Sequence, residues 1–183
     1  MFWRGVWGYL PANIVQGVVG FLAIVIFTRV LSPDDFGRYA LAFSVLTLAH
    51  VAVFSWLEAA MARFWASATP GGDLAGHFAS LYRSAGLLTL AFVPVVALVL
   101  WLWPAHPLLK FALAAGLIGC PVRCFVKLAQ ERYRAAGEVA KAASLDMAIS
   151  IGGLAIGVGF AFAGAGGAAP LLGLGLAPLM ALP

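Results

Sequence analysis

Four charged residues recur at helical spacing beside an apolar stretch of the chain. They lie four, four and three residues apart, at Arg123, Lys127, Glu131 and Arg134. On one helix this spacing gathers them within an arc of roughly 80°. A charged stripe is usually the solvent face of a helix. This one directly follows the uncharged run 111–122, so its first members are expected at membrane depth, where such side chains line water-filled cavities.

Two acidic residues border apolar stretches and need a partner or a hydrated position. Glu58 follows the uncharged run 39–57, and Asp146 precedes the uncharged run 147–183. Glu58 and Arg63 are five residues apart, about 140° around a helix, so they do not form a same-face pair. Each is therefore expected to point to water, to lipid headgroups or to another helix.

The cysteines and histidines do not form the clusters that metal binding or catalysis requires. Cys120 and Cys124 are four residues apart in an apolar segment, which predicts packing residues. His50 and His106 have no acidic neighbour in sequence, and His77 has one four residues before it. We expect His50 in a helix, His106 at an interface and His77 in a loop. The pattern predicts no metal site, no cofactor and no enzymatic activity.

The composition is that of a membrane protein. Of 183 residues, 63% are hydrophobic and 10% are charged, and the mean hydropathy is +1.01, far above that of a soluble domain. The net charge of +4 is compatible with nucleic-acid binding. However, the basic residues are scattered between apolar runs, as membrane topology requires. The composition therefore argues against a soluble domain and against a nucleic-acid partner.

The apolar runs and their breaks predict an all-α, polytopic transmembrane bundle of about six helices, since a span needs roughly 20 apolar residues. The predicted helices cover residues 6–29, 33–62, 84–104, 108–134, 143–163 and 171–183. Pro70, Gly71 and Gly72 are expected to break the chain after the second helix. The sixth helix is short for a span, so we expect the chain to be truncated inside it. The first run is too long for a signal-peptide core and lacks a small-x-small cleavage site.

Lys and Arg residues are unequally shared between alternate turns, and this asymmetry predicts the orientation. One set of turns holds only Arg29, Arg38 and Lys110. The other set holds Arg4, Arg63, Arg83, Arg123, Lys127, Arg132, Arg134 and Lys141. Because the positive side of a membrane protein faces the cytoplasm, the amino terminus is expected to be cytoplasmic.

The turn between the first two predicted helices, RVLSPDDFGRY at residues 29–39, specifies a helix start. Ser32 is a favoured N-cap, and Pro33 suits the first helical position. Asp34 and Asp35 then face the positive end of the helix dipole, and Asp35 has the spacing of a capping box.

The same turn carries a family resemblance. The segment 14–66 resembles the first two helices of the polysaccharide biosynthesis flippases, within the multidrug, oligosaccharidyl-lipid and polysaccharide exporter superfamily. Its turn is similar to the pattern R-x-L-x-P-x-x-F/Y-G-x-Y, matched by Arg29, Leu31, Pro33, Phe36, Gly37 and Tyr39. A basic residue near the end of the second helix also matches, as does the later segment 130–150. Members have two similar lobes, so the chain resembles one amino-terminal lobe.

The resemblance implies alternating-access transport of a lipid-linked oligosaccharide on an undecaprenyl pyrophosphate carrier across a bacterial inner membrane. It implies membrane lipids, a carboxy-terminal lobe and polysaccharide assembly proteins as partners. The cationic cavity would be lined by Arg29, Arg63, Arg123 and Lys127. Glu58 and Asp146 would be the partners of these cations or would bind a coupling proton or sodium ion.

Three alternatives stay open. A drug or cation antiporter of the same superfamily would rely on embedded acids, of which the spans offer only Glu58 and Asp146. A membrane enzyme acting on lipid-linked sugars would need clustered acids, whereas these are scattered. The third alternative is a non-transporting membrane subunit or a truncated remnant.

Overall fold

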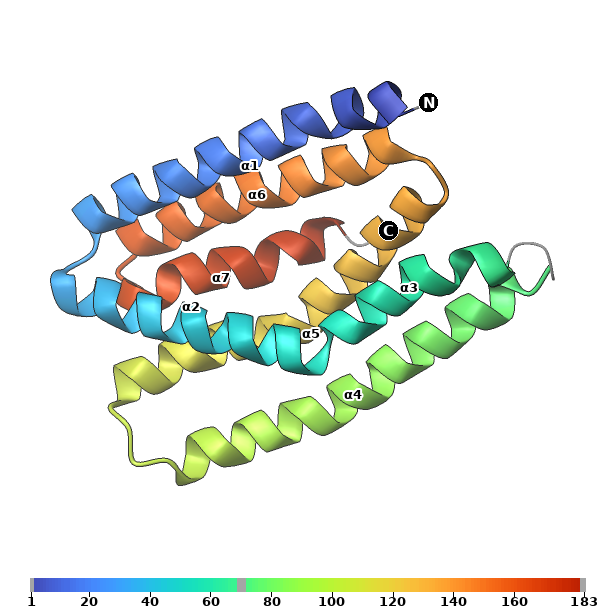
Figure 1. Ribbon diagram of the computed structural model, residues 1–183. Helices are drawn as coiled ribbons and strands as arrows, with labels where there is room; N and C mark the ends of the chain where they lie inside the picture. Colours follow the sequence, from blue (N-terminus) through green and yellow to red (C-terminus); the bar gives the residue numbers. More distant parts are fainter. Residues whose placement is uncertain (1, 69–71, 182–183) are drawn as a thin grey trace.

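Seven α-helices and two 3-10 helices make up the part of the chain that the computed structural model describes, residues 2–68 and 72–181. They are α1 (Phe2–Val30), α2 (Pro33–Val53), α3 (Ser55–Ala68), α4 (Leu74–Leu102), α5 (Pro107–Ala135), α6 (Val139–Phe162), η1 (Gly166–Ala168), α7 (Ala169–Leu176) and η2 (Ala177–Ala181). The long helices form one bundle (Figure 1), with the α1–α2 and α4–α5 turns at one end. The end of α3, the start of α4 and the α5–α6 connection lie at the other end. The all-α prediction is confirmed.

Five helices of the described residues are long and apolar enough to cross a membrane. They cover Leu10–Val30, Pro33–Val53, Leu74–Leu102, Pro107–Ala135 and Val139–Phe162. At about 1.5 Å per residue, even 21 helical residues extend for about 31 Å, the thickness of a hydrocarbon core. The protein is therefore a multi-pass membrane protein.

The outer face of α4 has the side chains that lipid requires. Its exposed residues recur at helical spacing, at Leu87, Leu90, Leu98 and Trp101, and Leu90 is 73% exposed. The opposite face, which includes Ala85 and Phe92, packs on the core. An apolar stripe of this size is unfavourable in water but is the normal lipid-facing side of a membrane helix.

Several helix boundaries differ from the sequence prediction. The predicted helix 33–62 is two helices, α2 and α3, separated at Phe54. The helix predicted from residue 84 begins at Leu74, and the one predicted from residue 143 begins at Val139. Charged residues near these starts end an apolar run but do not end a helix, because their side chains reach water while the backbone hydrogen bonds continue.

The last predicted helix, 171–183, is the short helix α7 followed by η2. The apolar segment Gly166–Met180 is too short to cross a membrane as one straight helix. The predicted break at Pro70 and Gly71, and the predicted end at Pro183, lie outside the described residues.

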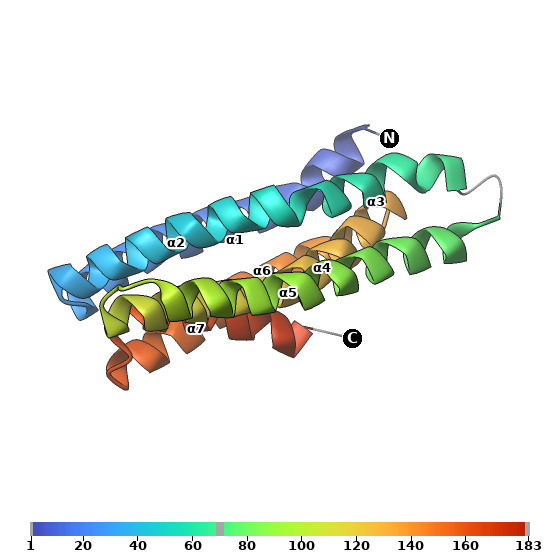
Figure 2. The ribbon, with the colours of Figure 1, turned by 90° about the horizontal axis from the view of Figure 1, so that it is seen from below.

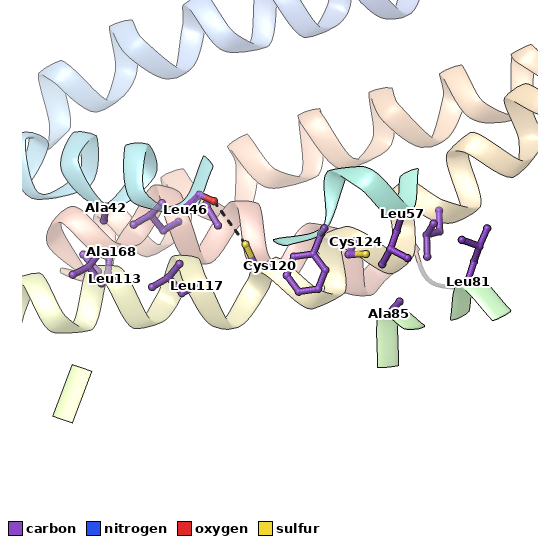
Figure 3. Close-up of a cluster of buried hydrophobic side chains, with 14 of the residues drawn as sticks. Ala42, Leu46, Leu57, Leu81, Ala85, Leu113, Leu117, Cys120, Cys124 and Ala168 are labelled. Carbon is purple, nitrogen blue, oxygen red and sulfur yellow. Dashed lines mark hydrogen bonds between the residues drawn. The ribbon is translucent and has the colours of Figure 1, made fainter. Parts of the chain in front are cut away.

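Helix α5 forms the centre of the bundle and contacts α2, α3, α4, α6 and α7. Its face toward α2 contributes Leu113, Leu117, Cys120 and Cys124 to the hydrophobic core (Figure 3). Both cysteines are fully buried, and the Cys120 thiol lies 3.8 Å from the backbone oxygen of Leu46 in α2. Their predicted role as packing residues is confirmed.

The turn before α2 caps the helix and also holds a distant loop. The Ser32 hydroxyl accepts a hydrogen bond from the Asp35 backbone N–H at 3.1 Å and donates one to the Asp35 carboxylate at 2.8 Å. The same carboxylate accepts from Arg38 at 2.8 Å and from the backbone N–H of Gly167 in η1. Asp35 therefore fastens the α6–α7 connection to the start of α2.

Glycines allow α7 to lie between α5 and α6 (Figure 1). Gly173 of α7 faces the backbone of Gly153 and Gly157 of α6, and Gly175 faces Gly119 of α5. Gly153 and Gly157 are four residues apart, the small-xxx-small spacing that lets membrane helices approach closely. A Cβ at position 173 would lie 2.7 Å from the Gly157 nitrogen, which is inside van der Waals contact.

Gly173→Ala is expected to destabilise the protein by about 1–3 kcal/mol, because α6 and α7 must separate to admit the methyl group. Gly159→Ala in α6 is the matched control, since a Cβ there meets nothing within 4 Å. Thermal unfolding of the purified protein in detergent measures both changes. Equal unfolding temperatures for the two variants would contradict this packing.

Candidate functional site

A polar pocket of about 220 Å³ lies among the apolar helices α1, α5, α6 and α7. Six of its ten lining residues are polar or charged: Gln16, Arg123, Lys127, Gln130, Asp146 and Ser150. The others are Val126, Ile149, Leu174 and Pro178. So many polar groups among membrane-spanning helices mark the pocket as the candidate functional site.

Helical periodicity brings these side chains together. Arg123, Lys127 and Gln130 are four and three residues apart and so lie on one face of α5. Asp146 and Ser150 are four residues apart on α6. The structure thus places the first two residues of the predicted charged stripe at a cavity. Beyond the cavity, the stripe continues toward the end of α5.

Asp146 joins α6 to α5 through two ion pairs. It is only 6% exposed, and its carboxylate lies 3.4 Å from Lys127 Nζ and 2.8 Å from Arg134 Nη2. Arg134 also donates to Glu131 at 2.6 Å. A buried carboxylate is costly unless it is paired and hydrogen-bonded. Two cations on α5 meet this requirement.

Arg123 and Gln130 bring to the pocket a charge and a hydrogen-bonding atom that have no partner among the described residues. Arg123 is half-buried, and within the described residues no acidic side chain lies within salt-bridge distance of it. Gln130 is 1% exposed, and its side-chain oxygen has no hydrogen-bond partner in the described part of the chain. Water or a bound polar molecule satisfies such groups.

An apolar crevice of about 390 Å³ adjoins the pocket between α1, α2, α6 and α7. The two cavities share Gln16, Ser150 and Leu174. The crevice is lined by aromatic and aliphatic residues such as Phe27 and Phe43. A cationic pocket next to an apolar crevice is complementary to an amphipathic molecule with an anionic head and a hydrocarbon chain.

Two of the four predicted cavity cations, Arg29 and Arg63, lie elsewhere. Both are exposed, and neither lines the pocket or the crevice. Arg29 is in the last turn of α1, where a cation favours the helix dipole. The Arg63 guanidinium lies 5.8 Å from the ring centre of Phe64. A transport role for these two residues stays a prediction.

The predicted ion-coupling residue Glu58 pairs with a histidine that sequence reasoning left without an acidic neighbour. Glu58 Oε1 lies 2.8 Å from His50 Nε2, eight residues before it. This spacing is not that of an ordinary side-chain pair within one helix. The two residues lie on either side of the break at Phe54, and no proline or glycine marks that break in the sequence. The pair could therefore not be predicted from the sequence and is seen only in the structure.

The other two histidines also have structural positions. His77 lies in the first turn of α4 and not in a loop, so that prediction is wrong. His106 is the N-cap of α5 and accepts a hydrogen bond from the Leu108 backbone N–H at 3.3 Å.

Sequence reasoning missed Gln16, Gln130 and Ser150 as pocket residues. These residues are uncharged polar side chains inside or beside apolar runs. Such residues predict a polar site less strongly than charged residues do.

Comparison with known protein families, curated proteins and solved structures finds no significant match to the chain. The flippase resemblance of the α1–α2 turn therefore stays a prediction.

Asp146→Asn is expected to destabilise the protein by about 1.5–3 kcal/mol, because Lys127 and Arg134 lose their shared charged acceptor. Glu138→Gln is the matched control, since its pair with Lys141 is exposed on both sides and contributes little. Thermal unfolding in detergent compares the two acid-to-amide changes. If the variants unfold at the same temperature, Asp146 does not fasten α6 to α5.

Proposed function

We propose that this chain binds the anionic headgroup of a lipid-linked oligosaccharide and moves it across a bacterial inner membrane, as part of a flippase. The observation that carries the proposal is the polar pocket with Arg123 at its wall and the apolar crevice beside it. The resemblance of the α1–α2 turn to polysaccharide flippases supports the same function.

The polar pocket has the features that transport of a charged headgroup across a membrane requires. A pyrophosphate with attached sugars does not cross hydrocarbon unaided, because its charges lose their hydration. A cation in a water-filled cavity lowers this cost. The planar guanidinium of Arg123 is suited to bind two phosphate oxygens at once. Lys127 adds positive charge at the same wall while it also pairs with Asp146.

The crevice supplies a place for the hydrocarbon chain of the carrier. Its wall between α1 and α2 includes Phe27, Tyr39 and Phe43, and the two helices contact each other only sparsely. A polyprenyl chain held there keeps its apolar surface away from water, while the headgroup occupies the pocket. We propose that a carboxy-terminal lobe or a partner subunit completes the transport path.

The charge asymmetry supports an orientation with the amino terminus in the cytoplasm. The bundle end that holds the end of α3, the start of α4 and the α5–α6 connection (Figure 1) is the end rich in Lys and Arg. Asp146 lies about two turns after the start of α6, so the pocket is in the half of the bundle nearer this end. A lipid-linked precursor in the cytoplasmic leaflet would meet the pocket directly.

The antiporter alternative is less favoured. An antiporter of cations needs an acid that is free to bind the ion. Asp146 already contacts both Lys127 and Arg134, and Glu58 already contacts His50.

Arg123→Ala is expected to weaken binding of undecaprenyl pyrophosphate by about 10–100-fold, the equivalent of one charge-assisted hydrogen bond pair. The measurement is lipid titration of the purified protein in nanodiscs. Arg83→Ala, which removes an exposed arginine of α4, is the matched control and should bind as the unmodified chain does. The uncharged alcohol undecaprenol should bind weakly to all three proteins.

Equal affinity of the unmodified chain for the alcohol and the pyrophosphate would contradict headgroup recognition. Equal loss of affinity in Arg83→Ala would contradict the assignment to the pocket.

A further inference from the structure

A partly buried histidine–glutamate pair bridges the break between α2 and α3. His50 is 8% exposed, and its Nε2 lies 2.8 Å from Glu58 Oε1. Neither residue lines the polar pocket or the crevice, so the pair is a separate feature of the bundle. Within the described residues, Glu58 has no Lys or Arg within salt-bridge distance. Among the described residues, its carboxylate is therefore hydrogen-bonded to the imidazole and has no cationic partner of the Lys or Arg type.

Side-chain hydrogen bonds accompany the break that this pair bridges. The junction sequence VAVFSWLE contains neither Pro nor Gly, the usual causes of a sharp kink. Instead, the Ser55 hydroxyl donates to the Val51 carbonyl at 2.6 Å. The Trp56 indole N–H donates to the Val53 carbonyl at 2.8 Å. The chain changes direction here (Figures 1 and 2). Backbone hydrogen bonds continue on both sides of the junction, from the Phe54 N–H to the His50 carbonyl at 2.9 Å and from the Leu57 N–H to the Phe54 carbonyl at 3.0 Å.

Phe54 anchors the junction in the core. Its side chain is fully buried and packs edge-on against Phe92 of α4, with 5.4 Å between ring centres. On its other side it lies 6.0 Å from the His50 ring. Phe54 stands between the end of α2 and the start of α3, and element-terminal residues are where hinges absorb changes in φ and ψ.

One atom of the pair is unsatisfied. His50 Nδ1 is buried and has no hydrogen-bond partner in the described part of the chain. With Glu58 ionised, Nε2 carries the hydrogen that bonds Oε1, so Nδ1 is a free lone pair. A proton from the aqueous phase that binds Nδ1 converts the pair from a net charge of −1 to a neutral imidazolium–carboxylate pair. The new N–H then needs an acceptor, which this arrangement does not provide.

We propose that His50 and Glu58 form a proton-binding site and that its protonation changes the angle between α2 and α3 at Phe54. Burial favours the neutral, protonated pair over an isolated carboxylate. The protonated Nδ1 requires a hydrogen-bond acceptor, and its search for one rearranges the hydrogen bonds at the bend, those of Ser55 and Trp56. The site does not depend on the proposed transport function, although a transporter with such a site would have a means of coupling to protons.

Other titratable groups near the junction are few. From α5, the buried thiol of Cys124 interacts electrostatically with Glu58. From α4, His77 contacts the Met61 carbonyl of α3 at 3.4 Å, and Tyr82 stacks on Phe125 of α5. On α3 itself, Arg63 is exposed. Among these groups only His77 carries an imidazole, as His50 does, which makes it the necessary control.

The test is the distance between spin labels on the two helices, measured in phosphatidylcholine nanodiscs. Labels at Leu41→Cys in α2 and Ala62→Cys in α3 occupy exposed positions, and the native thiols are buried. The proposal predicts a shift of the interlabel distance between about pH 5 and pH 8, the range in which histidine changes charge. His50→Gln and Glu58→Gln should each abolish the shift, while His77→Gln and His106→Gln should keep it.

No shift in the unmodified pair would overturn the proposal, and this measurement does not require any histidine or glutamate variant to fold. A shift that persists in His50→Gln or Glu58→Gln would also overturn it, as would a shift lost in His77→Gln. None of these readouts involves lipid binding, so the result is independent of the Arg123→Ala titration.

Discussion

The two ion pairs of Asp146 are the interaction on which the candidate site depends. An ionised carboxylate among membrane-spanning helices must be paired or hydrated. Lys127 and Arg134 meet this need from α5 and thereby fasten α6 to the central helix. With Asp146 neutralised in this way, Arg123 is left to face the cavity without an acidic partner among the described residues. The pocket owes its cationic character to that distribution of charges.

Close backbone packing places α7 against α5 and α6, where it lines one side of the pocket. Glycines on α5, α6 and α7 let the short helix α7 lie inside the bundle, and Leu174 of this helix reaches both the polar pocket and the apolar crevice. Asp35 holds the connection that leads into α7. A motif that is locally a helix cap therefore also positions a distant segment. The hydrogen bonds of Asp35, at the start of α2, and the ion pairs of Asp146, near the start of α6, lie at different levels of the bundle. Asp35 positions the segment between α6 and α7, and Asp146 joins α6 to α5.

The sequence was sufficient to predict the class of fold and part of the site. Apolar runs predicted the long helices, and the spacing of Arg123 and Lys127 predicted a shared face that the structure places at a cavity. The contact of Asp146 with Lys127 is one of the pairings that the family resemblance implied. Its contact with Arg134 was not predicted, because the two residues lie on different helices. The break at Phe54 was missed because neither Pro nor Gly marks it in the sequence. His50, four residues before the break, was therefore left without its partner. Helix starts were misplaced where charges ended an apolar run but not the helix.

The central claim is that a water-filled polar pocket exists inside a membrane-spanning bundle. Its most direct test is the reaction of single introduced cysteines with a charged, membrane-impermeant thiol reagent in native membranes. Ser150→Cys lies at the pocket, and Leu90→Cys lies on the outer face of α4. The account predicts that the thiol at position 150 reacts and that the thiol at position 90, surrounded by lipid, does not. Reaction at position 90 without reaction at position 150 would contradict it.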